Sequence, residues 1–234
     1  MRPTLANQID KGLLQITATQ NNRARPVHGA KITIFNTDQK QIEEIITDDS
    51  GQTPQIQLPA PPLDYSLVPG SPMPYAQYNI HITADGFAPL AINDVQVLPD
   101  TLALQNCPLL PEEIAAQQPF EAEIITIDHH TLYYEYPPKT PEPAVKPLPP
   151  PTGFVVLDRV VVPETIVVHD GPPDSRAPNY YLPFRDYIKN VASSEIYATW
   201  PDASIKANVL AIISLTLNRV FTVMLPQIKI MFKV

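Results

Sequence analysis

A proline-rich run between Pro137 and Pro151 constrains the fold of this chain more than any other feature. The run reads PPKTPEPAVKPLPPP, and prolines this frequent remove the backbone donors that helices and sheets need. Such a run is typical of an extended polyproline II spacer. The chain of 234 residues holds 29 prolines against 7 glycines. We therefore expect two folded parts joined by a linker at 137–151.

Composition excludes several classes of partner and site. The formal net charge is -8 at pH 7, and no lysine- or arginine-rich run is present, so we expect no nucleic-acid partner. Cys107 is the only cysteine, which excludes an intrachain disulfide and a cysteine zinc cluster. The N-terminus lacks the apolar core of a signal peptide. The longest apolar stretch, 209–217, is too short to span a bilayer, so we expect a buried helix there and no membrane partner.

The part before the linker shows short runs in which apolar and polar residues alternate. No helical periodicity is present in this part, and turn sequences such as Asp48-Asp49-Ser50-Gly51 place glycine where a positive φ is needed. Regularly spaced short strands are typical of a β-sandwich, which we predict over 1–111 in a mainly β chain. The seven candidate strands are centred on 14–16, 32–34, 42–45, 56–58, 80–82, 92–97 and 102–104.

Three stretches of this part resemble a known family. They read RPVHGAKITIF, TDDSG and YNIHITADGFAP, and together they resemble the carboxypeptidase regulatory-like, or transthyretin-like, β-sandwich. The resemblance covers most of the first hundred residues. It implies a module that braces or spaces other domains.

Residues 112–153 form the segment that connects the two parts. A strand is predicted at 121–127, and the sequence Asp128-His129-His130 follows it. These side chains are candidate metal ligands, but adjacent strand residues point to opposite faces, and no further ligands with zinc spacing accompany them. We therefore expect no metal and no cofactor.

The part after the linker, 154–234, changes its period along the chain. Strands are predicted at 154–157 and 165–168, and a first helix contains Tyr187, Ile188 and Val191 at helical spacing. Pro201 is typical of the first position of a second helix, which is predicted to run to about residue 220. Its buried side is predicted at residues 205, 209, 212, 216 and 220. This part is therefore predicted to be α+β with two helices.

The run 187–219 resembles the signature of a family of wall-lytic enzymes. It reads YIKNVASSEIYATWPDASIKANVLAIISLTLNR, and it resembles the SpoIID-like peptidoglycan lytic transglycosylases, most of all the spore cortex-lytic enzymes of the SleC type. The upstream sequence VPETIVVHDGPPD resembles the strand and loop before that signature. The resemblance implies cleavage of cortex glycan strands during germination and a location in the spore cortex or cell wall. It assigns catalysis to Glu195 and substrate binding to Lys206.

A single carboxyl group is sufficient for this chemistry. The acid protonates the glycosidic oxygen, and its conjugate base then accepts the proton of the sugar's own 6-hydroxyl, so that an anhydro ring closes without water. Hydrolytic glycosidases usually need two carboxylates. The neighbouring Asp202 fits the first turn of a helix, and Trp200 is interpreted as an aromatic residue that packs between the helices.

Two departures from the family limit the expected activity. Ile213 stands where the broader family has an arginine, a position at which SleC-type sequences also depart from the family. The ending VMLPQIKIMFKV resembles nothing in the family. We therefore expect a C-terminally truncated enzyme that cleaves cortex peptidoglycan poorly or not at all. The alternative is a non-catalytic structural or binding module associated with the cell wall or spore coat. A third interpretation is a scaffold with partners on the proline-rich segment; the oligomeric state is unknown.

Overall fold

The computed structural model describes residues 9–20, 25–116, 123–133, 161–169, 176–222 and 230–231. The chain divides into two compact units, Met1–His129 and His130–Val234, and each is described by itself. The predicted linker at 137–151 and the predicted strand at 154–157 lie outside the described residues.

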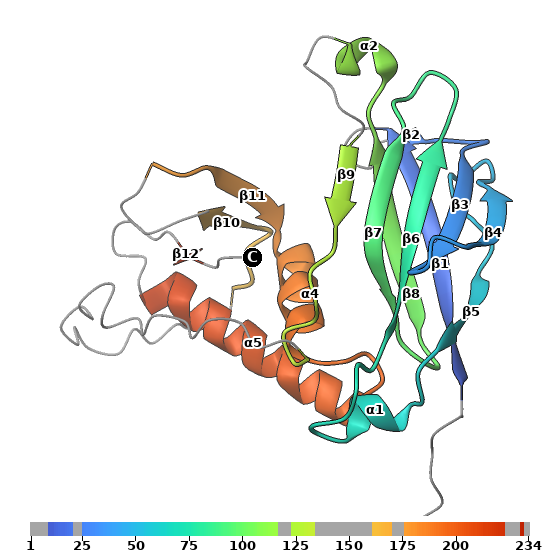
Figure 1. Ribbon diagram of the computed structural model, residues 1–234. Helices are drawn as coiled ribbons and strands as arrows, with labels where there is room; N and C mark the ends of the chain where they lie inside the picture. Colours follow the sequence, from blue (N-terminus) through green and yellow to red (C-terminus); the bar gives the residue numbers. More distant parts are fainter. Residues whose placement is uncertain are drawn as a thin grey trace, which may run out of the picture. The chain divides into compact units, whose positions relative to one another are not determined.

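The first unit is a β-sandwich of two sheets (Figure 1). Its elements are β1 (Asp10–Gln20), β2 (Arg25–Pro26), β3 (Lys31–Asn36), β4 (Gln41–Ile46), β5 (Ile56–Ala60), α1 (Asp64–Leu67), β6 (Ala76–Thr83), β7 (Leu90–Val97), β8 (Leu102–Leu109), α2 (Glu112–Ala115) and β9 (Glu123–Thr126). In one sheet β1 pairs antiparallel with β2 and β5 and parallel with β8. The other sheet has the strand order β4-β3-β6-β7-β9.

Alternation along the strands builds the core between these sheets. The centre of β3 pairs Ile32 with Ile45 of β4 on one side and with Ile82 of β6 on the other. Because successive strand residues face opposite sides, every second apolar residue enters the interior. The buried apolar cluster includes Leu14, Ile16, Ala18, Ile32, Ile34, Leu58, Tyr78, Ile80, Ile82, Ile92, Val97, Cys107 and Leu109.

The seven predicted strands are confirmed, since they lie within β1 and β3 to β8. The sequence pattern predicts that the sandwich ends at residue 111, whereas the first unit continues through β9, which pairs parallel with β7. The short helices α1 and α2 and the two-residue strand β2 were not predicted. A helix of four residues makes a single turn, so its sequence carries no helical period.

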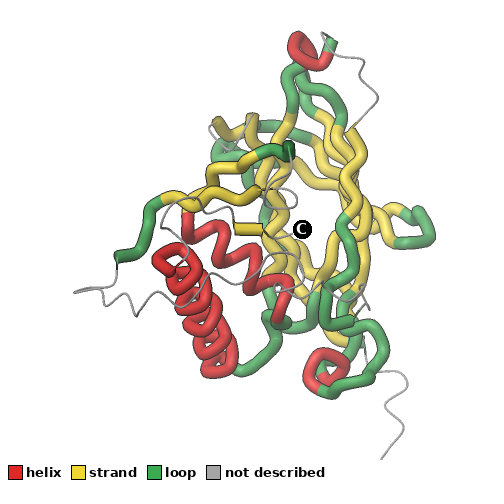
Figure 2. Tube along the Cα trace, turned by 90° about the vertical axis from the view of Figure 1, so that its left-hand side faces the viewer, coloured by secondary structure: helices red, strands yellow, loops and turns green. Residues whose placement is uncertain are grey.

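The second unit combines a small sheet with two helices. Its elements are β10 (Thr165–His169), β11 (Asn179–Pro183), α4 (Phe184–Glu195), α5 (Asp202–Thr222) and β12 (Ile230–Met231). The strand order is β11-β10-β12, and α4 and α5 lie side by side (Figures 1 and 2). The buried cluster is formed by Ile166, Val168, Phe184, Tyr187, Ile188, Ile212, Leu217 and Val220. The predicted fold class is thus confirmed: a mainly β chain, with a sandwich followed by an α+β part that has two helices.

Two details of α5 differ from the prediction. The helix begins at Asp202, and the Pro201 carbonyl accepts the N–H groups of Ser204 and Ile205, so Pro201 precedes the helix instead of occupying its first position. The prediction of a buried helix at 209–217 is wrong for one face, because Leu210 is 63% and Leu215 is 57% exposed. Among the described residues, no helix has the length and apolarity needed to cross a membrane.

Candidate functional site

Glu195 is the last residue of α4. The helix ends there because Ile196 is extended, with φ -140° and ψ 150°, while its N–H bonds to the Ala192 carbonyl at 3.2 Å. Serine hydroxyls in the last turn donate to carbonyls three residues back, and the Ser194 hydroxyl lies 2.8 Å from the Val191 oxygen. The Glu195 side chain is exposed to solvent.

The turn between the helices is built around a buried tyrosine. Tyr197 is 7% exposed, and its carbonyl accepts the N–H of Trp200 at 3.1 Å. The Trp200 ring meets the Tyr197 ring edge-on, with centroids 6.4 Å apart and an interplanar angle of 81°. Trp200 is half-buried, so this contact agrees with the interpretation of Trp200 as a packing residue.

A segment far from this turn in sequence contacts it. His130 stacks at a tilt on Tyr197, with ring centroids 4.4 Å apart, and the next residue, Thr131, donates its hydroxyl to the Ser194 carbonyl. Burial lowers the pKa of His130, while hydrogen bonds with the backbone of Ile196 and Ser193 oppose that fall. This contact has no signal in the sequence, because no pattern at 130–131 indicates a partner 63 residues away.

Lys206, the predicted substrate-binding residue, lies in α5 and forms an ion pair within that helix. Its ammonium group pairs with the Asp202 carboxylate at 2.5 Å, and the two side chains are 71% and 79% exposed. The pair has i,i+4 spacing, which places both groups on one helix face. Within the described residues no hydrogen bond or ion pair joins Lys206 to Glu195.

Tyr187 is a buried residue of α4 that the sequence interpretation assigned only to helical packing. Burial raises the pKa of its phenol, a hydrogen bond with Thr216 of α5 lowers it, and the charge of Glu195 raises it. Tyr187 and Glu195 are eight residues apart and therefore share a face of α4. The negative charge of Glu195 thus acts on the pKa of a buried phenol.

His169 is the second buried polar group that sequence reasoning missed. It is 0% exposed at the end of β10, and its Nδ1 lies 2.8 Å from Oδ1 of Asn179, its partner in the β10–β11 register. The strand β11 escaped prediction because Asn179–Pro183 exposes all five residues and shows no alternation.

The candidate metal ligands at 128–130 have other partners. The His129 Nδ1 lies 3.0 Å from the Tyr75 hydroxyl, and the Asp128 carbonyl accepts a hydrogen bond from Gln96 at 2.7 Å. In the described ranges no group of three or more histidine, cysteine or acidic residues is placed to hold a metal ion.

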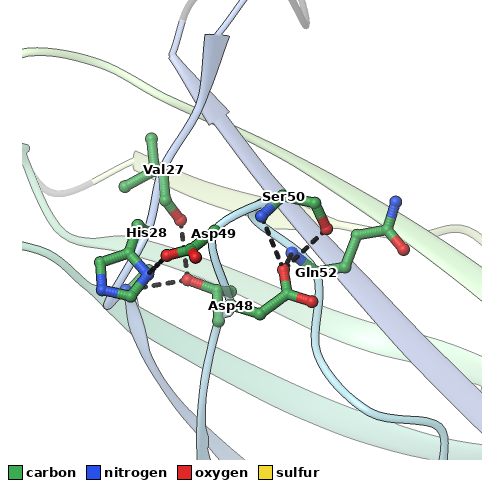
Figure 3. Close-up of polar contacts among 8 residues, drawn as sticks. Val27, His28, Asp48, Asp49, Ser50 and Gln52 are labelled. Atoms are coloured by element: carbon green, nitrogen blue, oxygen red, sulfur yellow. Dashed lines mark hydrogen bonds and ion pairs between the residues drawn. The ribbon is translucent and has the colours of Figure 1, made fainter.

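Polar contacts of the sandwich gather at the turn after β4 (Figure 3). One Asp48 oxygen accepts the N–H of Ser50 at 2.9 Å, its hydroxyl at 2.7 Å, and the N–H of Gln52 at 2.9 Å. These hydrogen bonds lower the pKa of Asp48. His28 pairs with Asp49 at 3.1 Å on the exposed side of the turn. This arrangement stabilises a turn and explains the aspartates without a ligand.

No family model matches the sequence, and no curated protein matches it. Structural similarity is found to the TIE protein of Bacillus anthracis, at 18% identity and a TM-score of 0.31, over 44% of this chain and 18% of that one. The minor pilin GBS52 of Streptococcus agalactiae is similar at 12% identity and a TM-score of 0.32, over 44% of this chain and 45% of that one. Catechol 1,2-dioxygenase of Acinetobacter radioresistens is similar at 14% identity and a TM-score of 0.33, over 51% of this chain and 58% of that one. The chain thus spans less than two thirds of each of these chains, and scores this low carry no argument about function.

Proposed function

We propose that the second unit derives from a peptidoglycan lytic transglycosylase of the spore cortex, with Glu195 as its acid and base. The observation that carries the proposal is the run 187–219, in which Glu195 ends one helix, Trp200 and Pro201 form the turn, and Lys206 lies in the next helix. This order is the one that the family signature implies. A location in the spore cortex or cell wall follows from the same proposal.

The chemistry requires one proton to be given and one to be taken back. The Glu195 carboxyl group donates its proton to the glycosidic oxygen as the bond from that oxygen to the anomeric carbon breaks. The carboxylate then accepts the proton of the sugar's 6-hydroxyl, whose oxygen bonds to the anomeric carbon. The products are a free hydroxyl on one fragment and a 1,6-anhydro ring on the other, and no water is consumed.

Three observations favour slow cleavage. Glu195 is exposed, whereas general acids work best when an enclosed site holds reactant and acid in alignment. Lys206 is held by Asp202, so binding a glycan through its ammonium group requires that pair to open. Ile213 packs against the apolar cluster of the unit, at the position where the broader SpoIID-like family has an arginine that would add a charge. We therefore propose a turnover well below that of a dedicated cortex-lytic enzyme.

A non-catalytic wall- or coat-associated module is the alternative. It is favoured by the sandwich, whose buried apolar core is formed by residues of the first unit. Such a module would bind the wall through the sandwich and leave the glycan uncut. Binding to cortex peptidoglycan without release of fragments is the behaviour that separates the two functions.

The test compares Glu195→Gln with Glu164→Gln on purified cortex peptidoglycan. Both glutamates are exposed in the second unit, and the first substitution removes a titrating proton at nearly constant shape. Loss of an acid catalyst costs about 10²–10⁴-fold in rate, so Glu195→Gln should lose all detectable release while Glu164→Gln keeps it. Equal release by the two variants would contradict the proposal.

A further inference from the structure

We propose that Thr131 and His130 are positioning residues that hold Glu195 in place from outside the 187–219 run. The inference rests on the proposed function for its catalytic consequence. Its structural content, a clamp on the end of α4, stands on contacts within the second unit.

The clamp acts on both sides of Glu195. The residue before it, Ser194, has its carbonyl oxygen bonded by the Thr131 hydroxyl. On the other side of Glu195, the His130 ring lies on the ring of Tyr197, with centroids 4.4 Å apart. A helix C-terminus leaves its last carbonyls without partners in the helix, and the Thr131 hydroxyl supplies a partner for one of them. The backbone of Glu195 is thereby fixed on each side.

The segment is itself held together at His130. The N–H of Leu132 lies 3.2 Å from the His130 Nδ1, which is an acceptor only while the imidazole is neutral. Burial, by lowering the pKa of His130, favours that neutral form. The same ring lies on Tyr197, whose ring contacts Trp200. The clamp therefore extends from the end of α4 to the residue before Pro201.

The catalytic consequence concerns alignment. A proton donor must lie within hydrogen-bond reach of the glycosidic oxygen, and small displacements of a reacting group reduce the rate steeply. Thr131 and His130 reach backbone atoms and a ring of the turn, not Glu195's carboxyl group, so their removal should lower kcat with little change in KM. Removal of a lysine that binds glycan directly would instead raise KM with little change in kcat.

The experiment uses the full chain and the pair Thr131→Val and Thr131→Ser. Valine keeps the shape of threonine without its hydroxyl, whereas serine keeps the hydroxyl. Thr165→Val, at an exposed threonine of the same unit, is the matched control. Two readouts need no activity: the emission of Trp200, the chain's only tryptophan, and hydrogen exchange at the amides of Ile196 and Tyr197. The third is kcat and KM on soluble cortex glycan fragments.

The clamp predicts faster exchange at Ile196 and altered Trp200 emission in Thr131→Val and His130→Ala, with wild-type behaviour in Thr131→Ser and Thr165→Val. It also predicts a kcat that is about 3–10-fold lower in Thr131→Val with KM within about twofold, as for the loss of one hydrogen bond. Unchanged exchange and emission in Thr131→Val would overturn the clamp. Altered exchange with unchanged kcat would overturn its catalytic role. If the wild-type chain releases no fragments, the proposed function fails, and exchange and emission alone decide the clamp.

Discussion

Replacing Thr47 with valine should destabilise the sandwich more than the same replacement at the equally buried Thr53. Thr47 is 2% exposed. Its hydroxyl donates to the Val27 carbonyl at 2.7 Å and accepts the N–H of Ala30 at 2.9 Å. Valine has the same shape, so the substitution removes both hydrogen bonds and leaves two buried backbone groups without these partners.

The magnitude follows from the number of groups left unpaired. Each unsatisfied buried donor or acceptor costs about 1–3 kcal/mol, so Thr47→Val should lower the free energy of unfolding by about 2–6 kcal/mol. Thr53 is equally buried, but its hydroxyl oxygen accepts one hydrogen bond, from the N–H of Ile16 at 3.0 Å. Thr53→Val should therefore cost about half as much. The exposed Thr126 is the control, where valine should change the free energy by less than about 0.5 kcal/mol.

Urea unfolding of the full chain, followed by far-UV circular dichroism, measures the difference. With a slope of about 2 kcal/mol per molar urea, a loss of about 3 kcal/mol lowers the midpoint by about 1.5 M. Trp200 fluorescence follows the second unit in the same experiment and should not shift. A midpoint for Thr47→Val equal to that of Thr53→Val would refute the assignment of two hydrogen bonds to one hydroxyl.

Three further predictions test burial, close packing and protonation. Burial raises the pKa of Cys107 to about 12, so its thiol should resist alkylation at pH 8 until urea unfolds the sandwich; rapid labelling of the native chain would contradict this. Gly12→Ala would place a Cβ 2.2 Å from the Leu98 carbonyl oxygen. We therefore expect the free energy of unfolding, measured by thermal denaturation, to fall by at least about 1–3 kcal/mol. An unchanged melting temperature would show that the backbone at Gly12 and Leu98 can move apart without cost. Because burial lowers the pKa of His130, the unfolded chain binds more protons below about pH 6.5, and the stability present above that pH is lost as the pH falls through the folded pKa. Unfolding monitored by Trp200 at pH 7 and pH 5 should detect this loss, and His130→Gln should reduce it.

Most of the fold could be predicted because local patterns specify it. Alternation in β1 and β3 to β8 identifies the strands, and the sequence Asp48-Asp49-Ser50-Gly51 identifies a turn whose glycine has a φ of 73°. The parallel pairing of β1 with β8 could not be predicted in this way. It joins residues such as Leu14 and Ala103, which are distant in sequence, and only the closing of the whole sandwich brings them together.

The candidate site was less predictable than the fold. A family signature directs attention to Glu195 and Lys206, but it does not reveal that Lys206 is paired with Asp202 or that Thr131 bonds to Ser194. Those contacts depend on how separate segments pack. The outer face of α5 was misjudged for the same reason, since the apolar run 209–217 is equally compatible with a helix buried on one face or on all sides.

The chemical nature of the released ends tests the central claim most directly. Cortex peptidoglycan is incubated with the wild-type chain and with Glu195→Gln, and the soluble fragments are analysed by mass spectrometry. The account predicts a low yield of fragments with 1,6-anhydro ends, each one water lighter than a hydrolysed end, and none from Glu195→Gln. Hydrolysed reducing ends, equal yields from both chains, or no fragments from the wild-type chain would contradict it.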